Sequence, residues 1–418
     1  MAIQPEGVLS RQLGLKDAVG IGLGAIIGAG IFVVTGVAAG ISGPAFIISL
    51  ILAGIVATFN ALSSAQLAAV YPQSGGTYEY GYRLLHPLLG FSAGWMFLIS
   101  KLAAGSIVAL GFGSYFYQLV PLGSPLILSL TAIVFLTLAN FFGIKKTGYL
   151  NLFIVGFTIL SLLYLSISGF PEIQSSNFTP FAPFGLKGIA EATALLFFAF
   201  TGYARIATLA EEVKDPEKTI PMAVIITIVA AIILYIVVSI VAIGVIGAPE
   251  MAGSSSPLQL VSNALSTPGI RTFTSLGAST AMLGVLLSQI LGISRMMLAM
   301  GRRKDLMPIF EKVHHKHKIP HFGIFITGLI IAGLCLVGNF EFILASAAFT
   351  ILLYYTITNL AALQQKKEFQ RYGKAVPALG LTGCLLMAFS LDLNVIVSGL
   401  ILLLIGLIVR FILHKVLK

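Results

Sequence analysis

The chain has 418 residues, of which 57% are hydrophobic and only 10% are charged. Because a soluble globular chain has about 25% charged residues, this composition excludes an ordinary soluble domain and indicates an all-α integral membrane protein, with residues 1–418 forming one transmembrane domain. The net charge of +10 comes from Lys and Arg residues that gather in segments expected to be cytoplasmic, which is the positive-inside pattern. We therefore interpret the charge as setting orientation and meeting anionic membrane lipid, and we exclude nucleic acid as a partner.

Apolar runs predict about twelve membrane-spanning helices, since a span needs roughly 20 apolar residues. An even number of spans places both termini on one side, and the basic loops at 301–318 and 366–374 place that side in the cytoplasm. We expect an integral protein of a prokaryotic cell (inner) membrane. The predicted spans are 17–39, 44–70, 90–118, 124–143, 148–169, 187–210, 221–247, 270–300, 321–338, 341–362, 376–391 and 393–414.

The first predicted span is unusually rich in glycine, with glycines at 20, 22, 24, 28 and 30. One interpretation is a packing face, because small residues four apart let two helices approach closely. The other is that the helix opens between Gly24 and Gly30, since each glycine weakens a helix by up to about 1 kcal/mol. Opened backbone inside a membrane must line a cavity or be buried in protein. The freed amides would attract an anion and the freed carbonyls a cation, which suits a zwitterion.

Lys101 lies near the middle of the third predicted span, roughly 15 Å from Phe91 at 1.5 Å per residue. An ionisable residue at that depth is a functional hypothesis. Lys101 could load and release a proton, or it could lie in a wet crevice without a specific task. The acidic residues all map to loops or span ends, so the sequence provides no carboxylate partner for it.

The sixth predicted span holds a second unusual stretch, in which Thr201 and Gly202 lie among aromatic residues from Phe197 to Tyr203. This stretch can also unwind. It lies five spans after the first, in a span of opposite direction, and paired broken helices of this kind are the best sequence indication of a transporter with inverted repeats. Downstream, Asp215 is predicted to cap a helix that has Pro216 at its first position.

Nothing in the sequence indicates an enzyme. There is no nucleophile–base pair, metal cluster or phosphate loop, and we expect no cofactor and no metal. Cys335 and Cys384 both lie in apolar runs and are interpreted as small buried hydrophobic residues.

These features together resemble the amino acid–polyamine–organocation (APC) transporter family. The resemblance extends over about residues 10–320 and rests on several motifs. They are Gly24-Ala25-Ile26-Ile27-Gly28-Ala29-Gly30-Ile31-Phe32, Tyr71-Pro72 with Ser74-Gly75-Gly76, Asn140 with Gly143-Ile144-Lys145, Phe198-Ala199-Phe200-Thr201-Gly202, Glu211-Glu212-Val213-Lys214-Asp215-Pro216 through Ile220-Pro221, and Arg295 with Ala299-Met300.

The resemblance implies the leucine-transporter (LeuT) fold. The first inverted repeat would cover about residues 17–169, the second about 187–362, and two peripheral helices about 376–414, with helices one and six broken. An amino acid would bind between the breaks. Its carboxylate would meet the amides of Gly28, Ala29 and Gly30, and its ammonium the carbonyls of Ile26, Phe198, Ala199 and Thr201. Phe200 or a nearby aromatic would act as a gate, and Ile27, Gly202 and Tyr203 complete the predicted site.

Two positions depart from the family pattern. Many members have a lysine in the fifth span, which is thought to carry the coupled proton, and the matching position here is Thr158. Many also have an acidic residue after the Gly-aromatic pair of span six, where this chain has Ala204. Lys101 could therefore replace the usual proton carrier, a cation could bind near Thr158, or the protein could be an exchanger without a coupled ion.

We expect a secondary active transporter of amino acids, with neutral ones favoured, that works by alternating access and proton-coupled symport. The alternatives are an exchanger without a coupled ion and a non-transporting sensor or partner subunit on the same fold.

Overall fold

A computed structural model describes residues 13–71, 75–142, 148–207, 213–315, 317 and 319–416. These residues form helices joined by short connections, and their only extended pairing is an isolated parallel bridge between Leu13 and Val213. The α-helices are α1 (Leu15–Ile26), α2 (Thr35–Ser42), α3 (Phe46–Val70), α4 (Thr77–Leu84), α5 (Pro87–Tyr117), α6 (Pro125–Phe141), α7 (Gly148–Gly169), α8 (Gly185–Phe197), α9 (Ala204–Ala207), α10 (Pro216–Met251), α11 (Pro257–Ala264), α12 (Ile270–Arg302), α13 (His321–Val337), α14 (Phe340–Gln364), α15 (Ala375–Ser390) and α16 (Leu393–Val416).

The predicted spans fall mainly on helical residues where the structure describes them, and the first span is broken at Ile27 and Gly28. Among the described residues, seven helical segments are long and apolar enough to cross a membrane, and α6, α13 and α15 are shorter apolar helices. The seventh predicted span ends at 247, where Gly247 (φ +78°) interrupts α10. The fold is therefore an all-helical membrane bundle, as composition and hydropathy indicate.

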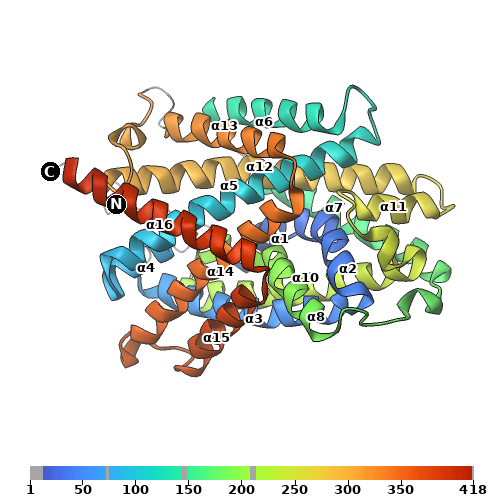
Figure 1. Ribbon diagram of the computed structural model, residues 1–418, viewed down its shortest axis with the longest axis horizontal. Coiled ribbons are helices and arrows are strands. Elements are labelled where there is room, and N and C mark those ends of the chain that lie inside the picture. Colours follow the sequence, from blue (N-terminus) through green and yellow to red (C-terminus); the bar gives the residue numbers. More distant parts are fainter. Residues whose placement is uncertain are drawn as a thin grey trace, which may run out of the picture.

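The helix α5 forms the centre of the bundle. It packs mainly against α14 and α12, and 78% of its most apolar stretch is buried, compared with 17% for α16. In Figure 1, α16 crosses the near surface of the bundle. The elements that carry the two unusual stretches, α1 and α8 with their continuations, lie among α3, α7 and α10.

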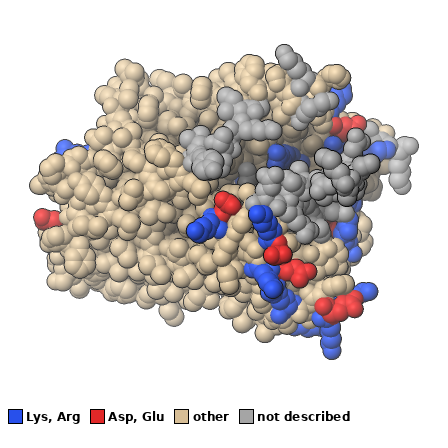
Figure 2. Space-filling model, turned by 180° about the vertical axis from the view of Figure 1, so that it is seen from behind, with Lys and Arg blue, Asp and Glu red and all other residues tan. Residues whose placement is uncertain are grey.

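The two ends of the bundle differ in charge. The helix α4 and the C-terminal end of α16 lie at one end of the long axis, and α11 lies at the other (Figure 1). Seen from behind, charged side chains gather toward the end that carries α4, and much of the remaining surface is uncharged (Figure 2). This distribution fits the cytoplasmic side that the positive-inside pattern predicts.

Pro216 begins α10 with Asp215 in the N-cap position, as predicted. The capping chemistry differs from the prediction, because Asp215 has φ +44° and its side chain makes no capping hydrogen bond. The motif residues Pro72, Ser74, Gly143–Lys145 and Glu211–Glu212 lie outside the described residues.

Candidate functional site

The first predicted span is interrupted where its glycines indicate. The helix α1 ends at Ile26, Ile27 turns to extended backbone (ψ 103°), and a π-helical segment resumes at Gly30–Val34 before α2. Ile31 and Phe32 donate their amides to the carbonyl of Gly28, at 3.2 and 3.3 Å. Apart from hydrogen bonds within the helices, the amides of Gly28, Ala29 and Gly30 donate to no backbone carbonyl of the described residues. Such amides at the start of a helical segment attract an anion.

The sixth predicted span changes its helical form where its aromatic residues predict unwinding. The helix α8 ends at Phe197, and residues Phe198–Tyr203 form a 3₁₀ helix, η5, before the short α9. A 3₁₀ segment inside a longer helix often marks a functional hinge. The hydroxyl of Thr201 donates to the carbonyl of Phe198 at 2.9 Å, so one predicted site residue already binds another.

The two interruptions lie directly against each other. A Cβ atom added to Gly202 would lie 2.2 Å from the carbonyl oxygen of Ala25, and one added to Gly30 would lie 2.6 Å from the Cα atom of Ala199. Glycine is therefore required at both positions for close backbone packing. The packing interpretation and the interruption interpretation of the first stretch both hold, because the small residues bring the two opened segments together.

This close approach distinguishes Gly30 from Gly28. Its missing side chain leaves space for the backbone of Ala199, whereas a Cβ at Gly28 would approach only the Val285 side chain, at 3.0 Å. Added bulk at Gly28 is therefore the cleaner way to perturb the first interruption without pushing it away from η5.

Several predicted side chains face neighbouring helices. Tyr235 of α10 donates its hydroxyl to the carbonyl of Ile26 at 2.9 Å, which uses one of the two lone pairs of that oxygen. Phe200, the predicted gate, is fully buried with its ring centroid 5.6 Å from that of Tyr235. Tyr203 is also fully buried, with its ring 5.5 Å from Tyr355 of α14.

Lys101 of α5 reaches the second interruption. Its half-buried side chain donates to the Thr201 hydroxyl, with Nζ and Oγ1 3.4 Å apart, and its Nζ lies 5.9 Å from the centroid of the Phe97 ring. A chain of polar contacts thus runs from Lys101 through Thr201 to the carbonyl of Phe198. The sequence indicated the depth of Lys101 but could not indicate Thr201, which lies 100 residues away.

Thr158 of α7 faces the first interruption. It lines a cavity of about 10 Å³ together with Gly24, Ile27, Asn151, Ile154, Val155, Ala281 and Gly284. Its hydroxyl donates to the carbonyl of Ile154 at 2.8 Å. A cavity of this size holds about one water molecule, and Thr158 and Asn151 are the polar side chains on its wall.

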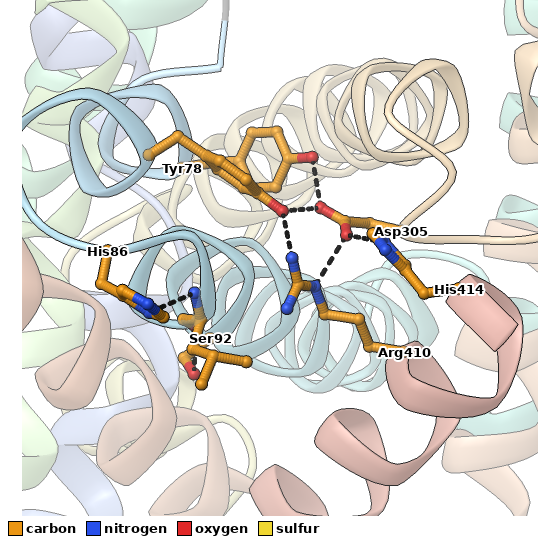
Figure 3. Close-up of polar contacts among 8 residues, drawn as sticks. Tyr78, His86, Ser92, Asp305, Arg410 and His414 are labelled. Carbon is orange, nitrogen blue, oxygen red and sulfur yellow. Dashed lines mark hydrogen bonds and ion pairs between the residues drawn. The ribbon is translucent and has the colours of Figure 1, made fainter. Parts of the chain in front are cut away.

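At the end that carries α4, a buried carboxylate joins three distant segments (Figure 3). Asp305, which follows α12 and is fully buried, accepts hydrogen bonds from Tyr78 and Tyr82 of α4, at 2.7 and 2.5 Å. It also binds Arg410 of α16 at 2.9 Å and lies 3.1 Å from His414.

These contacts change the acidity of the two tyrosines. Burial, reinforced by the hydrogen bond to Asp305, raises the pKa of Tyr82 to about 12 and raises that of Tyr78 further. Sequence reasoning missed this cluster, because Asp305 lies in a basic loop that gave no sign of burial. The available signal was the four-residue spacing of Tyr78 and Tyr82, which places both side chains on one face of α4.

Interrupted helices that meet inside a membrane bundle are typical of transport proteins. Comparison with known families gives the class of this one. The sequence profile of the amino acid permease family matches residues 17–415, nearly the whole chain. The chain therefore belongs to the amino acid permease family, which confirms the resemblance drawn from its motifs. Membership of a family of transporters also confirms that it is not an enzyme.

Several bacterial transporters are similar to this chain. An uncharacterized transporter of Mycobacterium tuberculosis is 36% identical over 393 residues, which cover 94% of this chain and 88% of that protein. The branched-chain amino acid permease BcaP of Bacillus subtilis is 31% identical over 438 residues, covering 98% and 94%. The methylthioribose transporter of the same organism is 30% identical over 410 residues, covering 92% and 89%.

Proposed function

We propose that the protein transports neutral amino acids across the cell membrane by alternating access, and that it binds them at the junction of α1, η1 and η5. The observation that carries this proposal is the contact between two opened helices, one of which presents the unpaired amides of Gly28, Ala29 and Gly30. These amides would hold the carboxylate. The carbonyls of Ile26, Phe198, Ala199 and Thr201 would hold the ammonium group.

The junction must open for this to happen. The small cavity beside it, about 10 Å³, accommodates one water molecule and not an amino acid. Binding therefore requires α1 and η5 to separate, which is the motion that alternating access supplies. The inverted repeats at about 17–169 and 187–362 would move against each other, with both termini in the cytoplasm.

The charges near the junction favour a neutral substrate. Lys101 is the charged group with a described contact to η5. Glu191 lies in the middle of α8, about two turns before η5 begins, and the other described acidic residues lie in loops, in α4 or toward helix ends. A cationic side chain would have no carboxylate to meet there, and removing a charge from water without a partner is costly. The similarity to a branched-chain amino acid permease makes leucine, isoleucine and valine the first substrates to test.

Lys101 provides a route for coupling to a proton. Its Nζ, the Thr201 hydroxyl and the Phe198 carbonyl form one chain of contacts. A change in the protonation of Lys101 would therefore alter the hydrogen bonding of a carbonyl that is proposed to hold the substrate. The other two coupling modes remain alternatives, namely a cation in the cavity beside Thr158 and exchange without an ion.

Uptake of radiolabelled leucine, isoleucine and valine into proteoliposomes tests the proposal. We expect accumulation that follows an imposed pH gradient without sodium, and Lys101→Gln should remove the dependence on that gradient. A requirement for sodium that Thr158→Val abolishes would assign coupling to the cavity. Uptake only into preloaded vesicles would identify an exchanger. Binding without uptake or counterflow would contradict transport and support a sensor.

A further inference from the structure

A second polar pocket lies far from the junction, at the end of the molecule that carries α11 (Figure 1). We call it the outer pocket, because the predicted topology places this end outside the cell. Its volume is about 440 Å³, within the range of small-molecule sites, about 300–1,000 Å³. Its walls come from the end of α5, from α11 and from the start of α12, through the residues Gln118, Leu119, Gln259, Asn263, Arg271, Thr272 and Ser275.

Hydrogen bonds hold the floor of the outer pocket in place. Gln259 is only 2% exposed, and it donates its amide to the side chain of Asn263 at 3.2 Å while accepting from the hydroxyl of Ser275 at 2.5 Å. Arg271 is exposed and donates to the backbone carbonyl of Asn263 at 3.1 Å. The polar groups are therefore positioned before any ligand arrives, which lowers the entropic cost of binding.

The charge of the outer pocket has one sign. Arg271 is the charged residue on its wall, and none of the ion pairs among the described residues involves it. A guanidinium has five N–H donors in a planar fork that matches a carboxylate. The first turn of α12, which begins at Ile270, adds the positive end of a 33-residue helix.

We propose that the outer pocket binds a small solute through its carboxylate group, at a site separate from the junction of α1 and η5. Arg271 holds the carboxylate, and the amides of Gln118 and Asn263 contact the remainder of the solute. The carboxylate could belong to the transported amino acid, which the pocket would concentrate near the outer face, or to a solute that is not transported. This site does not depend on the proposed transport function, because the chemistry of its wall defines it.

Protection of an introduced cysteine tests the proposal. The native Cys335 and Cys384 are both buried, so a charged maleimide should label purified Thr272→Cys protein mainly at position 272. At low ionic strength, where surface charge is least screened, acetate and leucine are added separately. A probe at twice its dissociation constant should slow labelling about threefold. Protection by acetate indicates recognition of any carboxylate, and protection by leucine alone indicates recognition of an amino acid.

Three controls decide the result. Lys187→Cys, on the exposed first turn of α8, should label at the same rate with and without the probes. In the Thr272→Cys background, Arg271→Gln should remove the protection, whereas Gly28→Val, which blocks the junction, should leave it intact. Equal labelling with and without both probes overturns the proposal, as does protection that Gly28→Val abolishes. If Thr272→Cys does not fold, Leu119→Cys, which also lines the outer pocket, replaces it.

Discussion

Replacing Gly202 with alanine tests whether the two interrupted helices must touch. The added Cβ would lie 2.2 Å from the carbonyl oxygen of Ala25, 2.3 Å from its carbonyl carbon and 2.6 Å from the amide nitrogen of Ile26. These are backbone atoms, so no side chain can rotate away, and α1 and η5 must move apart. Overpacking of this kind costs about 1–3 kcal/mol. We expect Gly202→Ala to lower the unfolding temperature and to abolish amino acid uptake.

The matched control is Gly156→Ala in α7, where an added Cβ would meet no atom within 4 Å. Both variants are purified in detergent, heated and assayed for the fraction that remains monodisperse, and then tested for leucine uptake in proteoliposomes. Gly156→Ala should behave like the wild-type protein. Equal unfolding temperatures and equal uptake in the two variants would refute the packing argument for Gly202.

Three further perturbations have defined outcomes. Gly28→Ala adds a methyl group at the first interruption, where it would contact only the Val285 side chain, at 3.0 Å. It should raise the KM of uptake about tenfold or more, since hydrogen bonds to a charged group contribute about 1.5–3 kcal/mol, with little change in the unfolding temperature. An unchanged KM would count against the site. Asp305→Ala leaves Arg410 without its carboxylate partner and should lower the free energy of unfolding by about 3–5 kcal/mol. The unfolding temperature should therefore be lower than that of Glu368→Ala, a control at an exposed site. The pKa of Tyr82 is raised from 10.0 to about 12. The stability that its neutral hydroxyl contributes is therefore complete below pH 10 and is lost as the pH rises to about 12. Tyr82→Phe should reduce the fall in unfolding temperature between pH 10 and pH 12, measured by heating the protein at each pH.

The sequence was sufficient for features that depend on local composition. The glycines between positions 24 and 30 predicted the first interruption, because glycine has a low helix propensity. Thr201 with Gly202 predicted the second interruption. Hydropathy likewise located the helices, because the bilayer requires long apolar runs.

Features that depend on tertiary contacts could not be obtained in this way. The role of Gly30 as a packing surface depends on Ala199, and the partner of Lys101 depends on how α5 meets η5. Asp305 looked like an ordinary loop residue, yet helices from both halves of the chain bury it completely. Sequence periodicity describes one helix at a time and carries no information on which faces meet.

We propose that the amides at the first interruption hold the substrate carboxylate. An experimental structure of the purified protein with leucine, isoleucine or valine bound tests it most directly. We expect α1 and η5 to lie further apart than in the present structure, with the carboxylate within hydrogen-bond distance of the amides of Gly28, Ala29 and Gly30. An amino acid bound elsewhere in the bundle, with those amides unoccupied, would contradict it.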